Sequence, residues 1–211
     1  MKSAVLCLML GGAVLAAQDW QPVIAELRDN NSGRKIDALR RLNAAGYGAA
    51  AEFVAPLVTD PDDNVQFAAI DAELEALIRA DPDLAGRFAI LASIPGVGAT
   101  TAFAILVEMP ELGSLEQGQA ASLAGLAPVA RDSGQWNGKR SIRGGRGALR
   151  HALYMPALVA TRFNPDLKAK YQALIAAGKP PKVAITAVMR KLLLLANALL
   201  RDKRPWTPRM A

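Results

Sequence analysis

The sequence closes on PDLKAKYQALIAAGKPPKVAITAVMRKLLLLANALLRDKRP, residues 165–205, and the second half of this stretch decides the fold class. Gly178 to Pro181 divide it into two helices, because glycine and proline end regular helical structure. The helix after this break is apolar almost all the way round, which is typical of a helix buried in a core. Four cations interrupt the apolar run and leave it too short to span a membrane: Lys182, Arg190, Lys191 and Arg201.

The rest of the chain is also rich in helix-forming residues. Apolar residues make up 52% of the 211 residues and aromatic residues 5%. Alanine and leucine dominate, without the alternation of branched and aromatic side chains that strands require. The sequence therefore predicts a mainly α protein, with a helical C-terminal domain over residues 70–211 and a shorter helical arm before it.

Residues 1–18 have one early lysine, an apolar centre and small residues at Val14–Ala17, a pattern typical of a signal peptide. The alternative is an N-terminal helix buried in the fold. Cys7 is the only cysteine and lies in this segment, so a mature chain would hold neither a disulfide nor a cysteine metal site. His151 is the only histidine, which excludes a histidine-rich zinc site, and we expect no bound metal.

Residues 19–69 have the rhythm of a partial HEAT-like helical repeat. A helix with Ser32 as its N-cap ends at Gly46, and DPDDNVQFAAI (60–70) starts another. Solenoid repeats bury their faces against neighbours, so this arm should be weakly stable alone. A change in composition places a domain boundary near residue 70, and Asp81–Pro82 should break the helix that follows.

The stretch SIPGVGATTAFAILVEM, residues 93–109, predicts a tight turn that leads into a helix of small residues. This is the pattern of a helix–hairpin–helix DNA-binding element. Gly96 and Gly98 would let the backbone approach a phosphate, and the N–H groups at the start of the next helix would donate to it. An ordinary turn between two helices is the equal alternative.

The charge of the chain is divided between its two parts. Residues 128–211 contain 17 Lys and Arg against 3 Asp and Glu, a net +14, whereas residues 1–127 contain 8 against 16, a net −8. A basic region of this kind favours a polyanionic partner, and a solvated basic surface is the alternative. Its densest part is an arginine- and glycine-rich segment with these candidate DNA-binding residues: Lys139, Arg140, Arg143, Arg146, Arg150 and His151.

Ser133 stands between Asp132 and Gly134, just before these cations. A serine hydroxyl is a poor nucleophile unless its surroundings activate it. Arginine side chains stabilise the charge that grows on phosphoryl oxygens during attack on a phosphodiester. The segment is therefore compatible with a covalent strand-transfer enzyme, and a serine that caps a turn in a phosphate-binding loop is the alternative.

Four ordered blocks now give a specific resemblance. From about Ile70 to Pro208 the chain resembles the C-terminal domain of the bacterial insertion-sequence transposases of the IS one-ten, one-sixteen and nine-oh-two type. The blocks are LASIPGVGATTAFAILVEM (91–109), LAGLAPVARDSG (123–134), SIRGGRGALRHALYMPALVA (141–160) and GKPPKVAITAVMRKLLLLANALL (178–200).

The resemblance implies that Ser133 is the recombinase serine, with Ser141 as the fallback nucleophile. It also implies supporting and DNA-facing roles for Asp132, Arg143, Arg146, Arg150 and His151. Family members act with guide RNA and bind divalent metal, such as Mg²⁺, through an acidic RNase-H-like domain that is not found before residue 70. We therefore expect no cofactor in this chain, a fused or truncated copy, and inactivity without intact transposase subunits. The expected partners are DNA, guide RNA, those subunits and further copies of this chain, with no membrane.

Two other classes of function compete with a transposase fragment. One is an exported HEAT-like interaction protein whose basic part is passive, and the other is a nucleic-acid-binding module without chemistry. The signal-like segment favours export, whereas a DNA-related function requires the cytoplasm. These two signals cannot both operate in one mature chain.

Overall fold

The computed structural model describes residues 20–46, 50–130, 132, 133, 135, 138 and 140–208. The predicted signal segment with Cys7 and the candidate Lys139 lie outside the described residues. The chain forms two compact units that divide between Ala76 and Leu77, called here unit 1 and unit 2. This division falls inside helix α4 (Asp63–Ala80), as does the boundary predicted near residue 70.

Unit 1 is a small set of helices. They are α1 (Gln21–Glu26), α2 (Ser32–Ala45), α3 (Ala51–Val54), the 3-10 helix η2 (Ala55–Thr59) and α4. The N-cap of α2 is Asn31, whose side chain accepts the Arg34 N–H at 3.2 Å, so the prediction of Ser32 as the cap was wrong by one residue. Gly46 ends α2 with a φ of 63°, as predicted.

The core of unit 1 consists of aliphatic side chains that face inward from α1, α2, α3, η2 and α4. Leu39 and Leu42 of α2 pack with Val54, Leu57 and Val65. An ion pair adds a polar link beside this core: Lys35 Nζ lies 2.6 Å from Asp60 Oδ2. The hydrogen bond from Lys35 lowers the pKa of Asp60 below its ordinary value, with a further contribution from the Asp62 N–H.

In unit 2, the Asp81 side chain accepts the N–H groups of Asp83 and Leu84 and so caps α5 (Pro82–Ala92). The predicted break at Asp81–Pro82 is confirmed. The elements that follow are α6 (Ala99–Glu108), α7 (Gln117–Leu123), β1 (Pro128–Val129), β2 (Ser141–Ile142), α8 (Gly147–Ala152), α9 (Tyr154–Phe163), α10 (Pro165–Ala176) and α11 (Pro181–Arg201). Helices therefore dominate both units, which confirms the mainly α fold.

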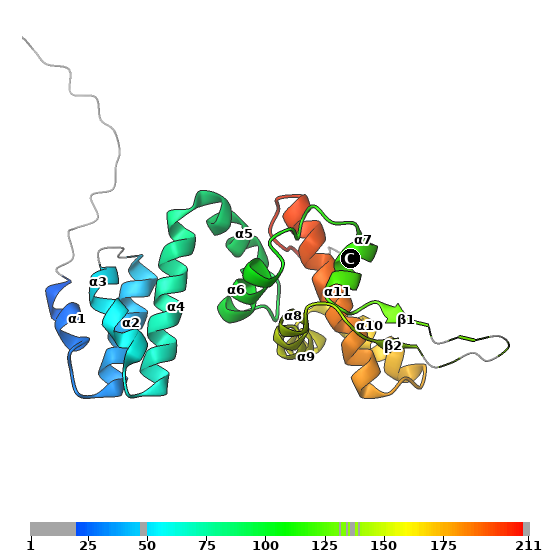
Figure 1. Cartoon of the computed structure of the whole chain (residues 1–211), viewed down its shortest axis with the longest axis horizontal. Helices are drawn as coiled ribbons and strands as arrows, with labels where there is room; N and C mark the ends of the chain where they lie inside the picture. Colours follow the sequence, from blue (N-terminus) through cyan, green and yellow to red (C-terminus); the bar gives the residue numbers. More distant parts are fainter. Residues whose placement is uncertain are drawn as a thin grey trace, which may run out of the picture. The chain divides into compact units, whose positions relative to one another are not determined.

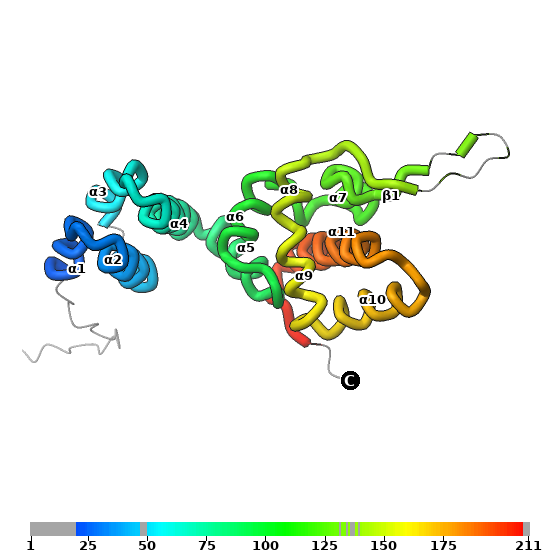
Figure 2. Tube along the Cα trace, turned by 90° about the horizontal axis from the view of Figure 1, so that it is seen from below, coloured from blue at the N-terminus to red at the C-terminus, as the bar shows by residue number. Residues whose placement is uncertain are grey.

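Helix α11 is the centre of unit 2 (Figures 1 and 2), and α5, α7, α9 and α10 pack against it. Leu192 and Leu193 are fully buried there. The buried Asn197 accepts the Gly113 N–H at 2.7 Å and donates to the Leu115 carbonyl at 2.8 Å, which fixes the segment between α6 and α7 on α11. The prediction that this apolar run is too short to span a membrane was wrong, because α11 is long and apolar enough to do so. More than half of that stretch is buried in unit 2, as a core helix requires.

Candidate nucleic-acid interface and serine loop

A two-stranded antiparallel ladder carries the candidate serine. Pro128 of β1 lies opposite Ile142 of β2, and Val129 lies opposite Ser141. The segment between the strands is called here the serine loop (residues 130–140). Its two ends are adjacent, because the strands that flank it pair with each other. Ser141, the fallback nucleophile, is exposed on β2.

Within the serine loop, Ser133 is exposed to solvent. The neighbouring Asp132 accepts the Gly138 N–H at 3.1 Å, a bond that spans the loop and brings its two sides together. Among the residues that the structure describes, none forms a hydrogen bond to the Ser133 hydroxyl. The hydroxyl is thus accessible to a large substrate.

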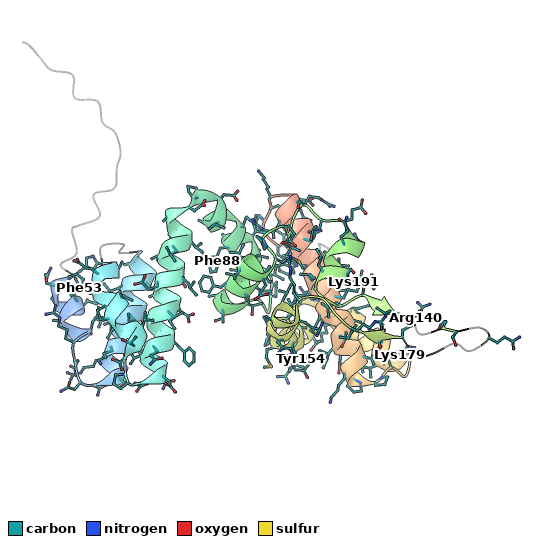
Figure 3. The ribbon with its side chains drawn as sticks, in the orientation of Figure 1. Phe53, Phe88, Arg140, Tyr154, Lys179 and Lys191 are labelled. Carbon is teal, nitrogen blue, oxygen red and sulfur yellow. The ribbon has the colours of Figure 1, made fainter. Side chains whose placement is uncertain are left out.

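The structure separates the predicted arginines into two pairs. Arg140 and Arg143 are exposed and form no ion pair with any described residue. Figure 3 labels Arg140 near Lys179 and places Lys191 along α11, and both lysines are exposed. These side chains can bind phosphate groups without first breaking an internal contact.

Arg146 and Arg150 instead make internal contacts. Arg146 Nη2 lies 2.7 Å from Glu111 Oε1, and Arg146 Nη1 donates to the Glu108 carbonyl at 2.6 Å. The hydrogen bond from Arg146 lowers the pKa of Glu111 below its ordinary value, while this pairing raises the pKa of Arg146. Arg150 Nη1 donates to the Gly144 carbonyl at 2.7 Å. His151 is exposed in the last turn of α8.

The turn between α5 and α6 uses its two candidate glycines differently. Gly96 has a φ of 100°, and a Cβ there would lie 2.8 Å from the Pro156 carbonyl oxygen and 3.0 Å from the Ala160 nitrogen. Its close backbone approach is therefore to α9. Gly98 is exposed, has open space where a Cβ would stand, and begins α6 without a side-chain cap. The N–H groups at this end of α6 are the ones left for a phosphate. The assignment as a helix–hairpin–helix stays a prediction.

The acceptors for Arg146 and Arg150 could not be identified from the sequence. Glu108 and Glu111 precede Arg146 by more than thirty positions, and no local pattern joins them. The paired glycines in RGGRG are the one local signal, since adjacent glycines favour a close approach of backbone.

Comparison with known protein families identifies a domain in unit 2. Residues 88–172 match the model of the Transposase IS116/IS110/IS902 family. The matched span contains the α5–α6 turn, the serine loop and four candidate DNA-binding arginines: Arg140, Arg143, Arg146 and Arg150.

The chain is also similar to parts of longer proteins. The pilin gene-inverting protein of Moraxella bovis is 35% identical over 159 residues, which is 71% of this chain and 49% of that protein. The 43.6 kDa protein of insertion element IS110 from Streptomyces coelicolor is 32% identical over 144 residues, which is 67% of this chain and 35% of that protein. The chain thus matches between a third and a half of the length of these relatives.

Unit 2 therefore contains a helical domain of the Transposase IS116/IS110/IS902 type. Residues 88–172 of unit 2 match that family domain, and relatives at 32–35% identity extend the similarity beyond it.

Proposed function

We propose that this chain takes part in DNA transposition or recombination, with unit 2 as the DNA-binding part and Ser133 as the nucleophile. The observation that carries the proposal is the exposed Ser133 on a loop whose returning side leads to Arg140 and Arg143, which form no ion pair with a described residue. The family match over residues 88–172 and the inverting activity named for the Moraxella relative support it.

The proposed reaction is a transesterification. The Ser133 hydroxyl attacks a DNA phosphorus atom, an Oγ–P bond forms, and one P–O bond of the strand breaks. The departing strand leaves as a hydroxyl that takes up a proton, and the serine proton passes to a base. No redox partner is needed. Arg140 and Arg143 would hold the phosphate and stabilise the charge on its oxygens.

Metal binding is assigned to a partner in this proposal. No group of three or more His, Cys, Asp or Glu side chains that could hold an ion lies together among the described residues. The divalent metal and guide RNA that the resemblance implies would arrive with an intact family transposase, which we propose as the partner of this chain.

The test is a search for a covalent protein–DNA adduct. The purified chain alone should form none, whereas addition of an intact relative with its guide RNA, its DNA and Mg²⁺ should yield an adduct on this chain. Ser133→Ala should abolish that adduct and leave DNA affinity nearly unchanged, because one neutral hydroxyl contributes little to a phosphate-dominated interface. Adducts on the Ala variant would assign the reaction to Ser141, and binding without any adduct would leave a nucleic-acid-binding module.

A further inference from the structure

Two glycine backbones cross at the base of the serine loop. Gly125 follows α7 and Gly145 precedes α8, with φ values of 65° and 66° that favour glycine. A Cβ at Gly145 would lie 2.6 Å from the Leu123 carbonyl oxygen, and a Cβ at Gly125 would lie 2.9 Å from the Gly144 carbonyl carbon. Both sites therefore exclude every side chain, and the two segments touch through backbone alone.

Two arginines close this crossing. The Arg146 N–H donates to the Leu123 carbonyl at 2.8 Å, and its guanidinium reaches Glu108 and Glu111 on the other side. Arg150 donates to the Gly144 carbonyl at 2.7 Å. The buttress, as we name the set Glu111, Gly125, Gly145, Arg146 and Arg150, thus joins the ends of α6 and α7 to the start of α8.

The buttress lies at both ends of the serine loop in the chain. From Gly125 the backbone runs directly into β1, and from β2 it returns directly to Gly145. Contact between the two glycines therefore fixes where the loop begins and where it ends. The ladder between β1 and β2 has four residues, too few to hold a hairpin by itself.

We propose that Arg146 is a positioning residue that holds the serine loop through the buttress and does not bind phosphate. The part of this inference that concerns Ser133 and DNA rests on the proposed function. Both terminal nitrogens of Arg146 have acceptors, and Glu111 balances its charge, so a phosphate would have to displace charge-assisted hydrogen bonds. Arg143, three residues earlier, is exposed and unpaired among the described residues, which makes it the matched control.

The first experiment is a salt titration of duplex DNA binding by the full chain. Each phosphate contact that is lost lowers the slope of log affinity against log salt by about 1. Arg143→Ala should lower the slope by that amount, whereas Arg146→Ala should leave it unchanged. Glu111→Gln should change DNA affinity equally in a chain that keeps Arg146 and in the Arg146→Ala variant. A slope loss in Arg146→Ala equal to that in Arg143→Ala, or a gain from Glu111→Gln that requires Arg146, would overturn the proposal.

The second experiment is hydrogen exchange at native conditions, which separates loss of position from loss of global stability. Arg146→Ala and Glu111→Gln should each raise exchange in segments 123–129 and 141–148, by about tenfold for the first variant, while α11 keeps its protection. An equal rise in α11, or no rise in either segment, would contradict a positioning role. Should Arg146→Ala fail to fold, Glu111→Gln still gives the answer.

The two proposals fail in different ways. If the wild-type chain shows no salt-dependent DNA binding, the proposed function fails, and the exchange experiment still tests the buttress. If Arg143→Ala behaves as expected and Arg146→Ala matches it, the function stands and the positioning role is wrong.

Discussion

The cations of α2 in unit 1 differ from Arg140 and Arg143 in unit 2 in whether they have acidic partners. In unit 1 the cations of α2 have acidic partners: Arg34 with Asp29, Lys35 with Asp60, Arg40 with Asp37 and Arg41 with Glu26. In unit 2 the arginines of the serine loop and β2 region, Arg140 and Arg143, have none among the described residues. Paired surface charges contribute little to stability and present little net field, whereas unpaired cations attract a polyanion. The difference points to unit 2 as the part that meets nucleic acid.

The largest expected effect is a core substitution that tests whether the units fold separately. Leu193 is fully buried in unit 2, and Leu193→Ala should remove about 2–5 kcal/mol of its stability through lost contacts and a cavity. Leu39→Ala is the matched change in unit 1, where Leu39 is 1% exposed. Hydrogen exchange along a urea series should show each variant weakening its own unit. A joint transition in both variants would mean that the units unfold as one.

The arginine contrast predicts a large effect on binding. Replacing Arg140 and Arg143 together by alanine should lower the slope of log DNA affinity against log salt by about 2. It should weaken binding to unrelated DNA sequences equally, because phosphate contacts carry no base information. The control is the double change of Arg34 and Arg40 in unit 1, which removes the same charge. If the unit 1 control weakens binding as much, net charge and not the serine loop governs affinity.

The glycines of the α5–α6 turn predict a smaller and more local contrast. Gly96→Ala should destabilise unit 2 by about 1–3 kcal/mol, because the left-handed φ is unfavourable and the new methyl would meet the backbone of α9. Gly98→Ala places its methyl in open space, and its cost should stay below about 1 kcal/mol. Thermal melts of the two variants measure the difference. If the start of α6 contacts phosphate, Gly98→Ala should change DNA affinity more than Gly96→Ala does, relative to the stability that each variant loses.

The parts of this fold that were predictable from sequence are those that depend on neighbours in the chain. The apolar pattern after Pro181 predicted the core helix, and Gly46 and Asp81–Pro82 predicted ends of helices. The family resemblance located the arginine segment. Neither the local pattern nor the resemblance could show which arginines of this segment are exposed and which make internal contacts. The reason is that the acceptors of Arg146 come from α6 and the segment after it. Contacts of that kind depend on tertiary packing, which local spacing does not encode.

The smallest expected effect is a dependence of unit 1 on acid. The pKa of Asp60 is lowered in the folded chain, chiefly by the hydrogen bond from Lys35, so the folded state favours the ionised carboxylate. The resulting stability is present above the ordinary aspartate pKa of about 4 and is lost as pH falls below it, because the unfolded chain then binds the proton more readily.

Asp60→Asn removes this titration and should flatten the acid limb of unit 1 unfolding, at the cost of lower stability at neutral pH. Melting followed by hydrogen exchange in α2 and α4, at a series of pH values, measures both effects. The corresponding change in unit 2 is Glu111→Gln, since the pKa of Glu111 is also lowered. Each substitution should alter the acid response of its own unit. If Asp60→Asn left the acid limb of unit 1 as steep as in the wild type, the Lys35–Asp60 pair would not be what links that unit to pH.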